Sequence, residues 1–302
     1  MLGGNVLPTP DGVDDAMDPG PLEVKSTGPP DLRLLVVNRA ENVSLVRQAL
    51  HGLATAVRLD EPLVNDMKTA VSEACNNVVL HAYDGDDGPL ELYASPHGNE
   101  VEVVVRDRGS GIQPHPVELE QTMQGVGLAL IQALTDRVEF GGGAGEGTEV
   151  RMTFSAEEDL FAGTLNGDVP SETAVPPPAD VQVSVCGLLV GPVLSSVVSM
   201  LAVRGGFSVE RLGDVQVLSD SISAHAMAGF LGRHVHLGVD ADDGRLDLRL
   251  GPLVAEGGRA VVEASAVGGL DPLLERLSDE VAVEPAPGGD GEVLRLTLLA
   301  PH

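Results

Sequence analysis

Residues 71–83 read VSEACNNVVLHAY. Glu73, Asn77 and His81 recur at intervals of four residues, so on a helix they lie along one face. An amide oxygen such as that of Asn77 is a suitable ligand for Mg²⁺ when phosphates supply the other oxygens. Glu73, one helical turn earlier, is placed to accept a proton from a water or a hydroxyl. The segment therefore predicts a metal-binding, acid–base helix face, with an ordinary solvated polar face as the alternative.

An acid and two glycines end the apolar strand pattern of residues 103–112, VVVRDRGSGI. The carboxylate of Asp107, at the end of that strand, can accept a hydrogen bond from an exocyclic amine such as that of adenine. Gly109 and Gly111 allow the chain to turn with positive φ and to approach a ligand closely. Taken alone, the pattern also fits an ordinary glycine-rich turn.

Two further glycine motifs follow. Gly125 and Gly127 open a helical pattern that continues through Leu128, where free N–H groups and the helix dipole favour a phosphate. Gly147 leads into a strand whose first residues include Thr148, a hydroxyl that can donate to a ligand. The alternatives are a loop that enters a helix and a plain hairpin turn.

In this order and spacing, the four motifs resemble the Bergerat-fold (GHKL) ATPase superfamily, and within it the small anti-sigma-factor serine/threonine kinases of bacteria. The resemblance spans residues 31–155. It implies ATP and Mg²⁺ as ligands, with Asn77 as the magnesium-chelating residue and Glu73 as the catalytic or water-positioning acid. It also implies that Asp107 recognises adenine, with Gly109 beside it.

The same resemblance assigns the remaining motifs to the two ends of the nucleotide. Gly111 belongs to the adenine side with Gly109, and Thr148 supports the adenine contact. Gly125 and Gly127, followed by Leu128, close the lid and meet the phosphates. Some relatives carry a basic residue just before the glycine pair, where this chain has Gln124, so phosphoryl transfer is less well supported than nucleotide binding.

The expected fold is α+β, a two-layer α/β sandwich of the Bergerat ATPase type in which helices cover one face of one sheet. In residues 31–155 we expect strands at 32–37, 89–95, 100–106, 137–140 and 149–154, and helices at 40–53, 62–82 and 127–135.

Residues 181–300 repeat this layout, with expected strands at 181–186, 235–239, 245–250 and 292–299 and helices at 192–203, 208–231 and 270–277. Three short segments also match: Ser72-Glu73 with Ser219-Asp220, Leu134-Thr135-Asp136 with Leu277-Ser278-Asp279, and Arg151-Met152-Thr153 with Arg295-Leu296-Thr297. We infer an internal duplication. The second copy is expected to be degenerate, because about Ala224 stands at the position of Asn77 and no counterpart of the Asp107 motif follows Gly251.

The chain accordingly divides into four expected regions. A disordered segment (1–30) precedes an ATP-binding domain (31–155), and a Pro-rich linker (156–180) leads to a degenerate ATPase-like domain (181–302).

Composition limits the classes of partner and the location. The formal net charge of −28 disfavours a general nucleic-acid binder and an anionic membrane surface, whereas it leaves ATP open because a few local donors and one metal ion can hold it. Two cysteines without metal-ligand spacing favour a reducing cytoplasm. Residues 185–203 lack charge and are long enough to span a bilayer, but Gly191-Pro192 predicts instead a strand, a break and a helix.

The leading hypothesis is an ATP-binding anti-sigma regulatory factor with serine/threonine protein kinase activity. Glu73 would activate a serine hydroxyl on an antagonist of the anti-anti-sigma type, and the sigma factor would be the alternative partner. The rival hypothesis is a non-catalytic module in which ATP gates a protein interface. The family suggests a homodimer, or an intramolecular pseudo-dimer in which the second copy occupies the dimer surface.

Overall fold

The computed structural model describes residues 30–111, 124–143, 145–160, 177–225, 229–230, 234–286 and 291–300. The segment expected to be disordered therefore lies almost wholly outside the described residues, as does most of the expected linker.

The first half contains β1 (Leu32–Val37), α1 (Asn42–Val57), α2 (Glu61–His81), β2 (Pro89–His97), β3 (Glu100–Asp107), α3 (Gln124–Leu134), β4 (Arg137–Gly143) and β5 (Gly147–Ser155). The second contains β6 (Val181–Cys186), a short 3-10 turn (Gly187–Leu189), α4 (Val190–Arg204), α5 (Val209–His225), β7 (His234–Asp242), β8 (Arg245–Leu253), α6 (Gly257–Ala264), α7 (Leu273–Leu277), β9 (Glu280–Pro285) and β10 (Glu292–Leu299).

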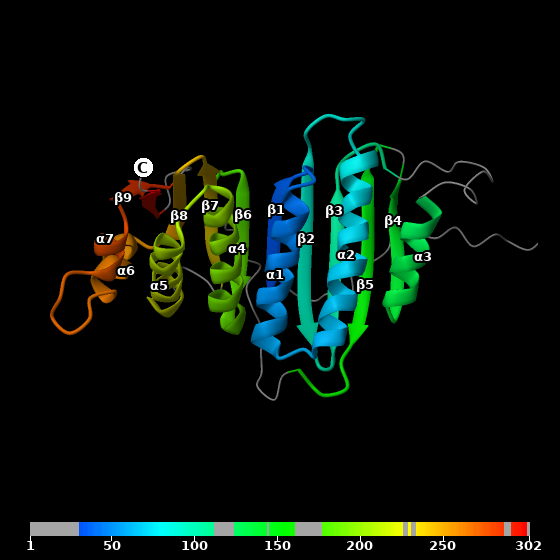
Figure 1. Ribbon diagram of the computed structural model, residues 1–302, viewed down its shortest axis with the longest axis horizontal. Coiled ribbons are helices and arrows are strands. Elements are labelled where there is room, and N and C mark those ends of the chain that lie inside the picture. Colours follow the sequence, from blue (N-terminus) through cyan, green and yellow to red (C-terminus); the bar gives the residue numbers. More distant parts are fainter. Residues whose placement is uncertain are drawn as a thin grey trace, which may run out of the picture.

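All ten strands belong to one sheet, in the order β4-β5-β3-β2-β1-β6-β7-β8-β10-β9. Figure 1 shows the helices on one face of this sheet, with the first half to the right and the second half to the left. The fold is thus the expected α+β, two-layer arrangement. The helix-free face carries charged side chains in pairs, such as Arg151 with Glu102 at 2.6 Å and Arg249 with Asp240 at 2.6 Å.

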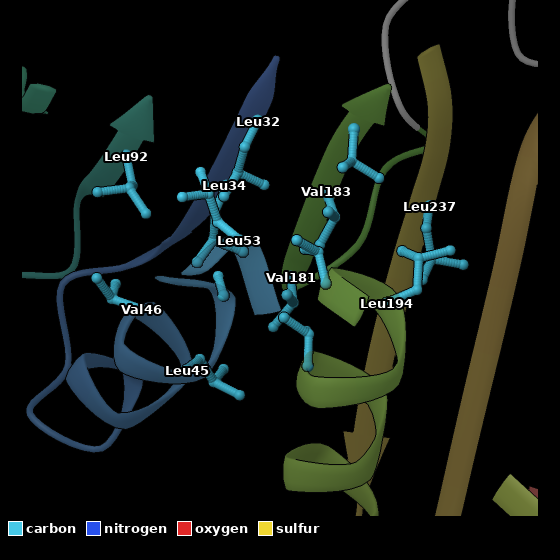
Figure 2. Packing of buried hydrophobic residues seen from close by; sticks show 14 of the residues in the cluster. Leu32, Leu34, Leu45, Val46, Leu53, Leu92, Val181, Val183, Leu194 and Leu237 are labelled. Atoms are coloured by element: carbon cyan, nitrogen blue, oxygen red, sulfur yellow. The ribbon is translucent and has the colours of Figure 1, made fainter. Parts of the chain in front are cut away.

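The two halves meet where β1 pairs with β6 in antiparallel register. Leu34 lies opposite Val183, and the two residues are equivalent because each stands third in the first strand of its half. Their pairing is what a two-fold relation between the halves requires. Above the strands α1 packs on α4, and a Cβ added at Gly52 would lie only 2.5 Å from the carbonyl oxygen of Pro192. Figure 2 shows the shared core at this junction, with leucines and valines from both halves in contact.

The second half repeats the sheet order of the first, counted outward from the junction: β1-β2-β3-β5-β4 against β6-β7-β8-β10-β9. The matched segments also make matched hydrogen bonds. The backbone N–H of Asp136 donates to the carbonyl of Thr153 at 3.0 Å, and that of Asp279 donates to Thr297 at 2.8 Å. The carboxylate of Asp136 accepts from the N–H of Ser155 at 2.7 Å, as that of Asp279 does from the N–H of Leu299 at 2.8 Å. These parallels support the duplication inferred from sequence.

The helix α2, which carries the first motif, begins and packs for local reasons. Asp60 caps it, accepting a hydrogen bond from the N–H of Leu63 at 3.4 Å, and a proline lies in its first turn. Its inward face is apolar and fully buried at Met67, Val71 and Cys75. The opposite, polar side is therefore left to face α3 and the solvent.

Several expectations about the elements were wrong. The break after β6 falls at Gly187, where φ is 54°, and α4 starts at Val190 with Pro192 in its first turn, a position that tolerates proline. The helix α5 passes through Gly213 and ends at His225, before the expected 231. Neither α6 nor β9 was expected. Among the described residues, one helical segment, Gly187–Arg204, is long and apolar enough to cross a membrane, but it packs between α1 and α5 as a core helix.

Candidate functional site

Glu73 and Asn77 lie together on the outer side of α2, as the four-residue interval predicts, and both are half-buried. They lie against the first turn of α3. A Cβ added at Gly127 would lie 3.3 Å from Oε2 of Glu73 and 4.0 Å from Oδ1 of Asn77. The absence of a side chain at Gly127 therefore leaves a space no larger than one methyl group between the acid, the amide and this turn of α3.

The helix α3 starts earlier than expected. It begins at Gln124 and not at Gly127, so Gly125 and Gly127 both lie in its first turn. Within this turn, Gly127 lies beside Glu73, and the N–H groups of a first helical turn have no partner within the helix. Leu128 is exposed over 37% of its surface and forms part of the rim of this region.

Asp107 ends β3 on the side of the sheet that carries the helices, and only 2% of its surface is exposed. Its Oδ1 accepts a hydrogen bond from the N–H of Gly109 at 2.8 Å. The turn then closes against the end of α2, because the N–H of Ser110 donates to the carbonyl of Ala82 at 2.9 Å. A Cβ at Gly109 would collide with that same carbonyl, so glycine is required there.

Two further glycines, Gly111 and Gly147, pack closely against the backbone at this turn. Gly111 has a φ of 74° and Gly147 a φ of 83°, and a Cβ at either would collide with backbone carbonyls, those of Gly143 and Asp107 respectively. Thr148 follows Gly147 directly and is half-buried at the start of β5. The structure thus places Gly127 at the α2–α3 contact and Thr148 beside the Asp107 turn, which closes against the end of α2.

Two neighbouring side chains refine this picture. Cys75 lies between Glu73 and Asn77 in sequence but points into the core, where burial raises the pKa of its thiol to about 12, so it is a packing residue. Arg47 on α1 donates to Oγ of Ser72, the residue before Glu73, at 3.3 Å.

A metal ion in this region would depend on Asn77 and on oxygen atoms from a bound ligand. Within the part of the chain that the structure describes, no cluster of three or more His, Cys, Asp or Glu side chains is arranged to hold a metal. An amide oxygen such as that of Asn77 suits Mg²⁺, which takes most of its oxygen ligands from water and phosphates.

Comparison with known proteins places the region in a family. The model of the histidine kinase-like ATPase domain matches residues 36–154. The anti-sigma F factor of Thermoanaerobacter sp. (strain X514) is 33% identical over 132 residues, which cover 40% of this chain and 91% of that protein. The chain belongs to the histidine kinase-like ATPase family. Membership confirms the resemblance drawn from the four motifs.

Another curated protein and one solved structure are also similar to part of this chain. The serine-protein kinase RsbW of Bacillus pumilus (strain SAFR-032) is 31% identical over 138 residues, or 40% of this chain and 83% of that protein. A solved histidine kinase domain, from the Erythrobacter litoralis EL346 blue-light activated histidine kinase, is 24% identical over 32% of this chain and 45% of that chain. Its TM-score of 0.28 is too low to add to the family match.

The counterpart region in the second half is built differently. The hairpins β2–β3 and β7–β8 have the same register, with Leu92 opposite Val105 and Leu237 opposite Leu250. Two residues further along β8 stands Pro252, where β3 has Asp107, so the carboxylate is absent.

The helix α6 begins at Gly257, five residues after Pro252. Its first N–H groups are held by Glu292, whose carboxylate accepts from Glu256 at 3.0 Å and from Gly258 at 3.2 Å. Glu292 begins β10, two residues before Leu294, just as Thr148 lies two residues before Val150. In the second half a carboxylate of the chain itself therefore binds a helix start.

Proposed function

We propose that this chain is an ATP-binding anti-sigma regulatory factor with serine/threonine protein kinase activity toward an antagonist of the anti-anti-sigma type. The proposal rests on family membership together with one observation: Glu73 and Asn77 both face the space that Gly127 leaves open at the start of α3. An acid, a neutral oxygen ligand and free helix N–H groups around one gap are the groups that a phosphoryl-transfer site needs.

Each end of the nucleotide has a suitable set of residues. The carboxylate of Asp107 would accept a hydrogen bond from the exocyclic amine of adenine. Gly109, Gly111 and Thr148 would lie around the base. Glycines are suited to that position because their backbone can approach a planar base closely.

At the phosphate end, Asn77 would hold Mg²⁺, and Gly125, Gly127 and Leu128 would lie along the phosphates at the first turn of α3. When bound, Mg-ATP supplies the phosphoryl group and the positive charge that balances it. Glu73 would accept the proton of a partner's serine hydroxyl, a general-base role that its position one turn from Asn77 allows.

The second half would not bind nucleotide. Pro252 stands where the first half has the carboxylate of Asp107, and Glu292 holds the first N–H groups of α6. We infer a degenerate copy whose β1–β6 and α1–α4 contacts occupy the surface that a second subunit would use, so that the chain is an intramolecular pseudo-dimer. Its partners would be a sigma factor and the antagonist, in the cytoplasm.

The rival function, an ATP-gated interaction module without catalysis, is favoured by Gln124, because a neutral side chain there supplies no charge to a transferring phosphate. Incubation with radiolabelled ATP and candidate antagonist proteins separates the two. Labelled serine that disappears in Glu73→Gln, while that variant still binds Mg-ATP, supports the kinase. Tight Mg-ATP binding with no label on any antagonist supports the gated module, and no binding at all contradicts both.

A further inference from the structure

Tyr83 lies just beyond the end of α2 and connects two strands at the Asp107 turn. Its hydroxyl donates to the carbonyl of Pro89 at 2.6 Å, at the first residue of β2. The same oxygen accepts a hydrogen bond from the backbone N–H of Arg108 at 2.8 Å. The ring lies against Gly88, where a Cβ would collide with it. The phenol therefore holds the residue that follows Asp107 at a fixed position relative to the end of α2.

The phenol suits this double role because it stays protonated at neutral pH. Burial raises the pKa of Tyr83, and the N–H of Arg108 offsets only part of that effect. The hydroxyl can therefore donate to one backbone group and accept from another at the same time.

Arg108 is also held at its other end. Its Nε and Nη2 lie 2.9 and 2.7 Å from Oε1 of Glu91, on the helix-free face of the sheet. Glu91 is only 1% exposed, and it is covered by Tyr93, which donates to its carboxylate, and by Arg33 at 3.6 Å. The Arg108 side chain is 66% exposed, so its contact with the buried Glu91 carboxylate is what holds its guanidinium in place.

The two anchors act on Asp107 from opposite sides of the sheet. The side chain of Asp107 lies on the face of the sheet that carries the helices, whereas that of the next residue, Arg108, lies on the opposite face. Since Oδ1 of Asp107 is already bound to the N–H of Gly109, Oδ2 is the oxygen left for an external donor. Its direction depends on the backbone that Tyr83 and Arg108 hold in place.

We propose that Tyr83, together with the Arg108–Glu91 ion pair, is a positioning element that sets the direction of the Asp107 carboxylate and thereby the preference of the site for adenine over guanine. The inference rests on the proposed function. Adenine presents an amine to a carboxylate at this position, whereas guanine presents a carbonyl oxygen, so discrimination requires the carboxylate to keep its direction.

The test compares the dissociation constants of Mg-ATP and Mg-GTP by calorimetry in the full chain and in Tyr83→Phe. Thr55→Val is the control, because it removes a hydroxyl that donates to the carbonyl of His51 at 2.8 Å on α1, away from the turn and from both anchors. Loss of a positioning hydrogen bond is expected to lower the ATP-over-GTP preference about tenfold in Tyr83→Phe. The preference should stay at the parent value in Thr55→Val.

A second pair of variants tests the other anchor without touching the phenol. Arg108→Met should also lower the preference, while Arg106→Met should not, because Arg106 pairs with Glu149 at 3.4 Å on the same face but does not hold the turn. This pair keeps the test available if Tyr83→Phe does not fold.

The outcomes separate the inference from the proposed function. If the parent binds Mg-ATP and the two anchor variants keep its full preference, the positioning role is wrong and the nucleotide site stands. Equal weakening of both nucleotides with a lower melting temperature would show a merely structural role and would also overturn the inference. If the parent binds no Mg-ATP, both fail together.

Discussion

Replacing Gly127 with alanine should stabilise the protein and weaken nucleotide binding at the same time. Gly127 lies in the first turn of α3, and glycine within a helix costs roughly 0.5–1 kcal/mol relative to alanine. A methyl group there would lie 3.3 Å from Oε2 of Glu73 and 4.0 Å from Oδ1 of Asn77, distances that both side-chain ends can accommodate. The variant should therefore fold and melt roughly 1–3 °C higher than the parent.

Binding should respond in the opposite direction. The added methyl fills the gap in which a phosphate oxygen or a metal-bound water needs hydrogen-bond distances of about 2.8 Å to its neighbours. Loss of one charge-assisted hydrogen bond costs roughly 1.5–3 kcal/mol, so the affinity for Mg-ATP should fall about 10- to 100-fold. Titration calorimetry measures this fall, and the upward thermal shift produced by excess Mg-ATP should shrink accordingly.

Gly213→Ala is the matched control. Gly213 lies within α5, is exposed, and has nothing within 4 Å of an added Cβ. It should give a similar rise in melting temperature and leave the affinity for Mg-ATP unchanged. If Gly127→Ala binds Mg-ATP as tightly as Gly213→Ala does, the gap between Glu73, Asn77 and α3 is not the phosphate site.

Three other changes give further tests. Asn77→Ala should abolish Mg-ATP binding in calorimetry because the metal loses the oxygen ligand assigned to it, whereas the neighbouring Asn76→Ala should bind normally; equal affinities of the two would show the metal site to be misplaced. Asp220→Ala in the second half should leave nucleotide binding at the parent level, and a clear loss would mean that this half is not degenerate. Gly52→Val should lower the free energy of unfolding by about 1–3 kcal/mol, because a Cβ would lie 2.5 Å from the carbonyl oxygen of Pro192. Urea titration measures this change, and an unchanged unfolding midpoint would contradict the tight α1–α4 contact.

The elements that the sequence predicts well are those with a clear internal pattern. The strands at Leu32–Val37, Val181–Cys186 and Glu292–Leu299 have the expected bounds because alternating apolar residues end at turn or polar residues. The helix α2 is equally clear, with its capping Asp60 and a proline in the first turn.

The elements that were missed depend on contacts far away in the sequence. The helix α6 opens with Gly257-Gly258, which by propensity reads as a loop. It forms because Glu292 caps it and because glycine allows close packing, as a Cβ at Gly258 would lie 2.9 Å from a methyl of Val283. The strand β9, which includes Val283, is an exposed edge strand whose pairing with β10 no local pattern specifies.

The candidate site divides in the same way. The helical interval of four residues is enough to place Glu73 beside Asn77, and the strand end is enough to place Asp107. The proximity of Gly127 to both α2 side chains, and the anchors at Tyr83 and Arg108, depend on how α3 packs and on the register of β2 with β3. Both relations are tertiary. Family resemblance suggests the contact of Gly127 with α2, but nothing in the sequence suggests the anchors at Tyr83 and Arg108.

The central claim is that the chain has one nucleotide site, in its first half. Titration calorimetry of the full chain with Mg-ATP measures the stoichiometry directly. One nucleotide bound per chain, lost in Asn77→Ala and kept in Asp220→Ala, is the result that the account predicts. Two nucleotides per chain would contradict the degenerate second half, and none would contradict the site itself.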